Sequence, residues 1–175
     1  MTNAPNLRRN TDPTFVGIAG VKRKHREQLD AFERWAAAGD WHAFHHAHYD
    51  WWMFPIDQRS QGQGMLYTVY AGEVVELKQD PTFIRDYLRG VVLLALSWGW
   101  DLAQRAYVPN PTSGQAWADW PIRLHKAAQS LKLFGFTEEF ESLRVLALDL
   151  IRRGKHFEYG RKDLRPLFTA DLPNA

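Results

Sequence analysis

Apolar residues return every three or four positions along much of the chain, which is the period of an amphipathic helix. The clearest case follows Asp80-Pro81, an N-cap residue and a proline at the first helical position. One side of this segment carries Ile84, Tyr87, Leu88, Val91, Leu94, Ala95, Trp98 and Leu102. The opposite side carries Val92, Leu93 and Leu96, and a helix that is apolar nearly all round is buried. We therefore expect residues 81–104 to form a long central helix.

Shorter helical patterns lie before and after this segment. They cover residues 25–38, 41–49, 121–134 and 137–151. Short polar side chains are expected to cap their starts, and glycines are expected to end them. The expected caps are Asp40, Asp119 and Thr137, and the expected stops are Gly39, Gly135 and Gly154. The patterns predict an all-α fold, a single-domain bundle of about five helices around one long central apolar helix.

The two ends of the chain lack a sustained apolar period. Residues 1–22 contain Pro5, Pro13, Gly17 and Gly20, and we expect them to form a flexible basic tail. The helical domain is expected over residues 23–168, and a C-terminal tail over residues 169–175.

Composition excludes several classes of site. The chain has 175 residues and no cysteine, which excludes disulfides, thiolate zinc sites, iron–sulfur clusters and a cysteine nucleophile. Residues 1–10 show no apolar core of a signal peptide, and the apolar stretch 90–102 is too short to span a bilayer. We expect a cytoplasmic protein without a membrane partner.

The charge is unevenly distributed, although the net charge is only +2. Residues 1–28 and residues 152–165 each hold six basic and two acidic side chains, whereas residues 29–151 hold ten basic and fifteen acidic ones. Basic ends can bind a phosphate backbone, but they also serve to solvate the ends of a chain. No nucleic-acid-binding motif accompanies this charge, so nucleic acid is not the partner that we expect.

Four of the seven histidines fall within residues 42–48. On a helix, His42, His45 and His46 would share one face, with His48 at its flank. Imidazoles one turn apart can chelate a divalent metal, and Asp50 could complete the site. The glutamate that follows the first histidine of a zincin motif is missing. The competing interpretation is a helix packed among aromatic residues, whose imidazoles form hydrogen bonds with their neighbours.

An aromatic run follows the histidines. Tyr49, Trp51, Trp52 and Phe54 could line a ligand groove, or they could fill the core between small helices. Of the two interpretations the core is favoured, because large aromatic side chains more often fill volume than wait for a ligand.

Three segments resemble a known family in their order and spacing. Tyr49-Asp50-Trp51-Trp52-Met53-Phe54-Pro55 resembles the Tyr-x-x-Trp-Leu-Phe-Pro signature of the opioid growth factor receptor conserved region. The segment 73–77, followed by Asp80 and Arg89, is similar to the short and long helices that come next in that family, and 120–136 is similar to its Arg-containing helix. Ala47 stands where the family has histidine.

The resemblance covers roughly residues 40–150 and implies a helical domain. It transfers no catalytic residue, because the family's bacterial members have no enzymatic role that can be mapped. It does draw attention to Arg123, which we add to the candidate ligand-binding residues.

Two hypotheses follow. The first is a non-enzymatic helical module that binds an unknown protein or small-molecule ligand through Tyr49, Trp51, Trp52, Phe54 and Arg123. The alternative is a metal-binding protein or metal-dependent enzyme with a divalent metal as cofactor. Its ligands would come from His42, His45, His46, His48 and Asp50. The sequence does not decide whether the protein is an enzyme, nor its oligomeric state.

Overall fold

The computed structural model describes residues 6–171, and this part of the chain is mostly helical, as the sequence predicts. The helices are α1 (Gly17–Ala38), α2 (Trp41–His46), α3 (Asp50–Met53), α4 (Ala71–Lys78), α5 (Pro81–Ser97), α6 (Pro121–Phe134), α7 (Thr137–Arg152) and α8 (Pro166–Thr169). Two short antiparallel hairpins join β1 (Trp100–Asp101) to β2 (Ala106–Tyr107), and β3 (Glu158–Tyr159) to β4 (Lys162–Asp163).

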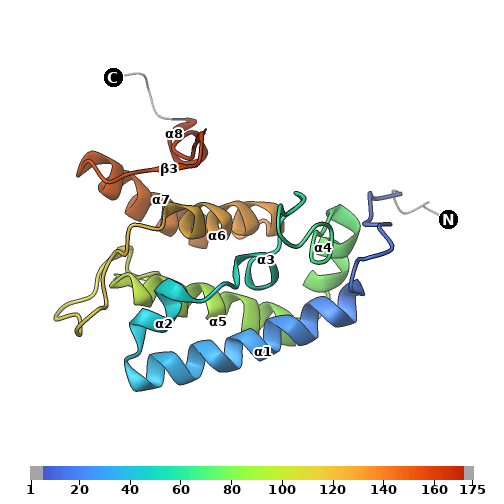
Figure 1. Ribbon diagram of the computed structural model, residues 1–175, viewed down its shortest axis with the longest axis horizontal. Helices are drawn as coiled ribbons and strands as arrows, with labels where there is room; N and C mark the ends of the chain where they lie inside the picture. Colours follow the sequence, from blue (N-terminus) through green and yellow to red (C-terminus); the bar gives the residue numbers. More distant parts are fainter. Residues whose placement is uncertain (1–5, 172–175) are drawn as a thin grey trace.

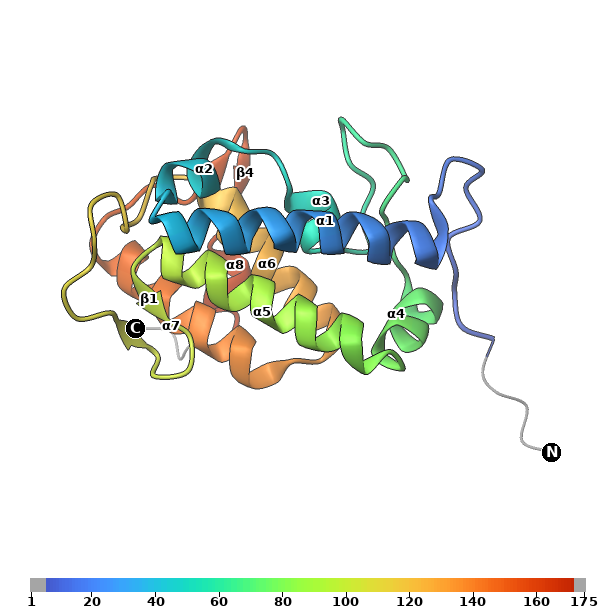
Figure 2. The same ribbon diagram turned by 90° about the horizontal axis from the view of Figure 1, so that it is seen from below.

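The long helices lie in two pairs. α1 packs along α5, and α6 packs along α7 (Figure 1). The short helix α3 lies between the two pairs and contacts both α1 and α6. Viewed from below, α1 and α5 run side by side for most of their length (Figure 2). The aromatic run of the sequence is therefore placed at the junction of the two pairs.

Local signals fix several helix ends as predicted. The Asp80 side chain accepts hydrogen bonds from the N–H groups of Thr82 and Phe83, at 2.9 and 3.1 Å, and starts α5. Gly39 and Gly135 follow α1 and α6 with φ of +66° and +77°, a left-handed conformation that glycine adopts without a steric penalty.

Other predicted ends are wrong. α5 stops at Ser97 rather than at residue 104, because Gly99 turns the chain with φ +70° and the backbone passes close to Gln115. Asp119 does not cap α6, since its own φ is +52° and Trp120 takes the N-cap position. Thr137 is the first residue of α7, whose N-cap is Phe136.

The predicted apolar face of α5 lies in the core. Tyr87, Val91 and Leu94 are all buried, and the stripe of α6 (Leu124, Ala127, Ala128, Leu131 and Phe134) is buried too. The Tyr87 ring stacks on Phe134 of α6 at 4.9 Å between centroids. Its hydroxyl donates to Ser130 Oγ, which in turn donates to the Pro55 carbonyl. These bonds satisfy polar groups that would otherwise be costly to bury.

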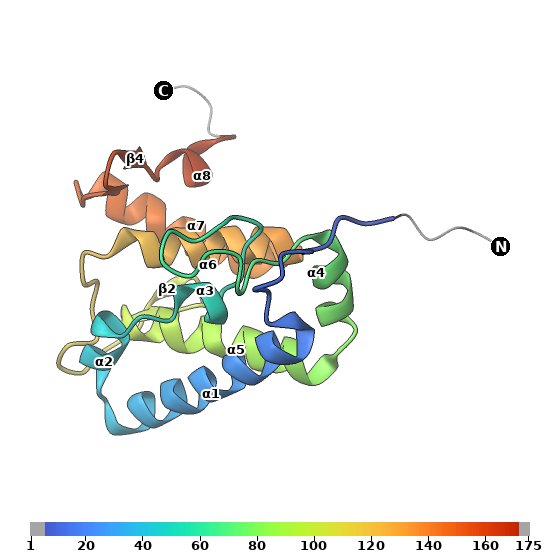
Figure 3. The ribbon, with the colours of Figure 1, turned by 45° about the vertical axis from the view of Figure 1, so that its right-hand side comes forward.

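The chain is anchored before the predicted domain boundary at residues 22 and 23. α1 begins at Gly17, and Val21 is fully buried. Asn10 is buried as well and donates to the carbonyls of Met65 and Thr68, while Arg9 pairs with Glu76 of α4. Figure 3 shows the segment before α1 passing beside α4. The predictions for residues 1–5 and 172–175 lie outside the described residues, whereas Thr169 belongs to α8.

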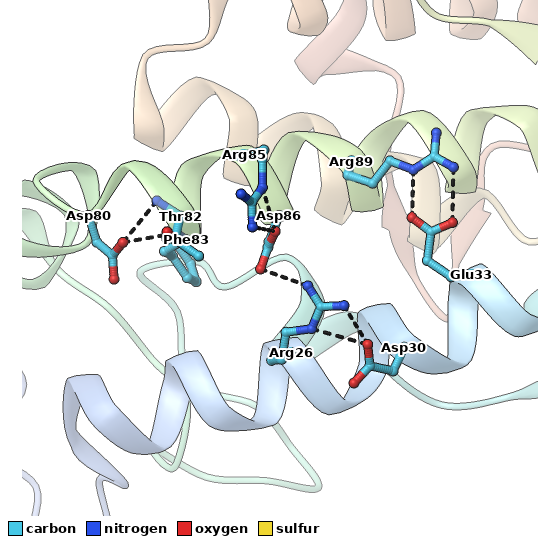
Figure 4. A network of polar contacts seen from close by, with 9 residues as sticks. All are labelled: Arg26, Asp30, Glu33, Asp80, Thr82, Phe83, Arg85, Asp86 and Arg89. Atoms are coloured by element: carbon cyan, nitrogen blue, oxygen red, sulfur yellow. Dashed lines mark hydrogen bonds and ion pairs between the residues drawn. The ribbon is translucent and has the colours of Figure 1, made fainter.

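Charged side chains join α1 to α5 along their outer edge. Arg26 of α1 bonds to Asp30 and reaches Asp86 of α5 at 3.0 Å, and Arg89 makes a two-pronged contact with Glu33 (Figure 4). The Arg26–Asp30 and Arg89–Glu33 pairs are exposed, whereas Asp86 is buried. Exposed pairs contribute about 0–1 kcal/mol each, so we assign the α1–α5 packing mainly to its apolar side chains. No helix among residues 6–171 is long and apolar enough to cross a membrane.

Candidate ligand-binding cleft

Arg123 is a buried structural joint between α6 and the α2–α3 connection. Its guanidinium donates to the carbonyls of Phe44 and Ala47, at the end of α2. A cation at the carbonyl end of a helix is favoured, because the last carbonyls lack partners within the helix. The guanidinium carbon lies 4.6 Å from the centre of the Tyr49 ring. Arg123 thus holds α3 against α6, and it is only 3% exposed.

Asp50 lies behind this joint, at the first residue of α3. Its carboxylate is 3.4 Å from Arg123 Nε and 3.9 Å from Lys126 Nζ. The facing Oδ1 and Nε atoms are buried without a well-aligned hydrogen bond, so the two groups interact as charges. Burial raises the pKa of Asp50, while Arg123 and Lys126 oppose that shift.

Lys126 extends from the joint into an open cleft. Its ammonium lies 3.9 Å from the centre of the Trp51 ring. Burial lowers the pKa of Lys126, Asp50 opposes this, and the positive charges of Arg123 and Lys162 lower it further.

The cleft consists of two adjoining cavities, of about 260 and 230 Å³. The residues common to both are Trp51, Ser60, Gly62, Ile122, Lys126 and Tyr159. Its walls come from α3, the loop 56–63, the start of α6 and the β3–β4 hairpin. Ile122, His125, Lys126 and Gln129 form the wall on α6, at the spacing of one helix face. The cleft is lined by aromatic rings and by the basic side chains of Arg59, Lys126 and Lys162, and Asp50 borders its smaller cavity.

The structure divides the predicted ligand-binding residues into two groups. Tyr49 and Phe54 are 1% and 0% exposed. Tyr49 still borders the smaller cavity of the cleft, whereas Phe54 borders neither cavity. They pack in the core, where the Tyr49 hydroxyl bonds to the Phe44 carbonyl and its ring meets Phe32 edge-on. Trp51 and Trp52 are half-buried and do line the cleft. Arg123 positions the wall of the cleft from behind.

The predicted metal ligands are not brought together. His42 and His46 stack with 3.7 Å between ring centroids, but His45 turns toward the Gly114 carbonyl. α2 ends at His46, so His48 lies outside the helix and lines the cleft, and Asp50 faces Arg123 and Lys126. Within residues 6–171, no three side chains of His, Asp, Glu or Cys are grouped to hold a metal ion.

Several cleft residues are absent from the predicted set. These are His125, Lys126, Trp120, Tyr159 and Lys162. A signal for part of them is present in the sequence, because His125 and Lys126 recur with Ile122 and Gln129 on the side of α6 next to its apolar stripe. The hairpin residues carry no such signal, since their position depends on how the end of the chain folds back.

Comparisons with known proteins found no relative of this chain. No family model matches the chain, no curated protein is similar to it, and no solved structure resembles it. The evidence for function is therefore the geometry of the cleft between α3 and α6.

Proposed function

We propose that this protein is a non-enzymatic binding module that takes a small-molecule ligand in the cleft between α3 and α6. The observation that supports this most directly is the position of Lys126 Nζ over the Trp51 ring, because both side chains border both cavities of the cleft. Pockets that combine aromatic walls with a few convergent polar groups are typical ligand sites. Three residues of the aromatic run, Tyr49, Trp51 and Trp52, border this cleft.

Binding is favoured over catalysis by the role of the cleft's carboxylate. A general acid or base must be free to exchange a proton with a bound molecule. Asp50 instead contacts Arg123 and Lys126, and its Oδ1 atom is buried. The charged residues at the back of the cleft therefore serve the packing of α3 on α6.

Thermal unfolding with a panel of small aromatic compounds tests the proposal. A ligand that binds only the folded state raises the midpoint of unfolding. We expect at least one compound to do so for the wild-type protein and not for Tyr159→Ala, in which an exposed wall of the cleft is removed. Tyr107→Ala is the matched control, because Tyr107 is also an exposed tyrosine of a two-stranded hairpin but lines other cavities. A panel without any Tyr159-dependent shift would refute the proposal.

A metal centre is the second candidate, and the stacked pair His42 and His46 is the observation in its favour. The rings lie one turn apart on α2, and both side chains are exposed. Further ligands would have to come from outside this pair. Metal analysis of the untagged protein tests this candidate.

The central position of α5, the distant kinship and the cellular location are also proposals. We propose that α5 is the central helix of one domain, supported by its packing against α1, α2 and α4 and by the contact of Tyr87 with Phe134 of α6. We propose a distant kinship with the opioid growth factor receptor conserved region and a cytoplasmic location, both of which rest on the sequence features given above.

A further inference from the structure

We infer that the ligand of the cleft is an aromatic phosphate, a small planar ring that carries a phosphate group. The inference rests on the proposed binding function and adds the chemical class of the ligand. It is drawn from the charges that line the cleft, from their mutual repulsion and from the exposed rings beside them.

Basic side chains line the larger of the two cavities of the cleft. Arg59, Lys126 and Lys162 all border the cavity of about 260 Å³, and no Asp or Glu is among the described residues that line it. Arg59 and Lys162 form no ion pair within the described part of the chain. A group with two negative charges suits such a site better than a neutral one.

The positive charges of the cleft disfavour further positive charge beside them. His125 lines the same cavity, and its pKa is lowered to about 4, first by burial and then by Lys162 and Lys126. The pKa of Lys126 is lowered in the same way, first by burial and then by the positive charges of Arg123 and Lys162. An anion placed among these groups would relieve the repulsion that the folded protein otherwise maintains.

Neutral donors accompany the cations. Ser60 is buried in the wall, and its Oγ accepts the N–H groups of Gly62 and Gln63, which leaves the hydroxyl hydrogen free to donate. Gln58, Gln61 and Gln129 also border this cavity and carry side-chain amides. A phosphate has enough acceptor oxygens to use several of these donors together.

Flat aromatic faces stand next to the charged groups. Trp120 and Tyr159 are 41% and 50% exposed, and their rings meet nearly perpendicularly at 6.2 Å. The Trp51 ring borders both cavities and lies 3.9 Å from the Lys126 ammonium. A planar ring can pack against these faces while its phosphate reaches Lys126 and Lys162.

Two other cavities are lined by acidic as well as basic side chains, with Arg105 beside Glu138 in one and Arg152 beside Asp149 in the other. A third cavity is lined by Arg153, which pairs with Asp149, and by Lys155. We assign the phosphate site to the Lys126 cleft because Ser60 and the exposed rings of Trp120 and Tyr159 border the same two cavities as its cations.

Calorimetric titration with benzyl phosphate and benzyl alcohol tests the inference, because the two compounds share the ring and differ in the phosphate. We expect benzyl phosphate to bind at least roughly tenfold more tightly than benzyl alcohol. Lys126→Met should remove most of this difference, whereas Lys132→Met, a change on the same helix outside the cleft, should preserve it. Lys162→Met changes an exposed hairpin residue and should weaken phosphate binding even if Lys126→Met fails to fold.

The outcomes separate the two proposals. Equal binding of both compounds, lost in Tyr159→Ala, would overturn the phosphate inference and leave the binding function standing. No binding of either compound, or phosphate binding unchanged in Lys162→Met and Lys126→Met, would also overturn the inference. Inorganic phosphate alone should bind more weakly than benzyl phosphate, because it makes no contact with the rings.

Discussion

The guanidinium of Arg123 lies over the ring of Tyr49, with 4.6 Å between the guanidinium carbon and the ring centre. The two side chains come from α6 and from the residue just before α3, and both bond to the Phe44 carbonyl. This contact joins the two walls of the cleft through its buried back. The position of Trp51 relative to Lys126 therefore depends on Arg123, although Arg123 does not line either cavity of the cleft.

Arg123→Met should destabilise the protein strongly. The change leaves the Phe44 and Ala47 carbonyls without their donor, and it leaves Asp50 with Lys126 as its nearest cation. Removing one partner of a buried charge pair costs about 3–5 kcal/mol of unfolding free energy. Chemical denaturation measures this, and the exposed Arg161→Met should change stability by less than about 0.5 kcal/mol.

A second variant identifies the cause. If the cost comes from an unpaired Asp50 carboxylate, Arg123→Met combined with Asp50→Asn should lose less stability than the sum of the two single changes. Strict additivity would show that the pair is not coupled, and a cost below about 1 kcal/mol for Arg123→Met would contradict the role of the joint.

Leu94→Ala should cost about 2–5 kcal/mol, because the side chain is buried on the packed face of α5 and its loss leaves a cavity. Val145→Ala on α7 is the matched control, since Val145 is 41% exposed and should lose little. Equal effects of the two changes on the denaturation midpoint would show that α5 is not packed as described.

Stability should fall as the solution becomes acidic, and His25 should be a main cause. The His25 Nε2 atom is buried without a partner, between Phe83 and Tyr87, with Asp86 of α5 and Arg26 of α1 as its charged neighbours. Burial lowers the pKa of His25 to about 4, against an ordinary value of 6.5. Between these two pH values the unfolded chain binds the proton and the folded protein does not, so stability present above pH 6.5 is lost toward pH 4.

The size of the His25 effect is about 3 kcal/mol, from the shift of its pKa. Denaturation curves at several pH values measure it. His25→Leu should flatten the slope between pH 6.5 and 4, while the slope from His125, whose pKa is also lowered to about 4, should remain. The exposed His156→Leu is the control. An unchanged slope in His25→Leu would show that this imidazole is not held neutral in the folded state.

A chelator should leave the thermal midpoint unchanged. The predicted ligands point to different partners: His45 to Gly114, His46 to the His42 carbonyl, and Asp50 to Arg123. A metal held by His42 and His46 alone would add little to folding. Stoichiometric metal in the untagged protein that is lost in His45→Ala would contradict this prediction.

Local sequence signals were enough to predict several helices and helix ends, but not the site. Asp80-Pro81, Gly39 and Gly135 act on the backbone next to them, and the structure confirms these ends. The apolar stripes of α5 and α6 could also be predicted, since the helical period alone places them on one face. Burial of Tyr49 and Phe54 could not, because a run of aromatic residues has the same appearance in a core and in a groove.

The contacts that build the cleft join distant parts of the chain. Arg123 meets Phe44 across 79 residues of sequence, and Tyr159 of the last hairpin meets Trp120. No periodic pattern encodes such contacts. The arrangement of the histidines differs from the expected one for another reason: α2 ends at His46, so His48 does not lie on the expected helical face.

A nitrogen-15 NMR titration with benzyl phosphate shows whether a ligand enters the cleft between α3 and α6. The indole N–H signals of Trp51 and Trp120 should shift, because both rings border the cleft, while that of Trp100, near the other hairpin, should stay in place. Shifts at Trp100 with none at Trp51 and Trp120 would place the ligand elsewhere and contradict the account.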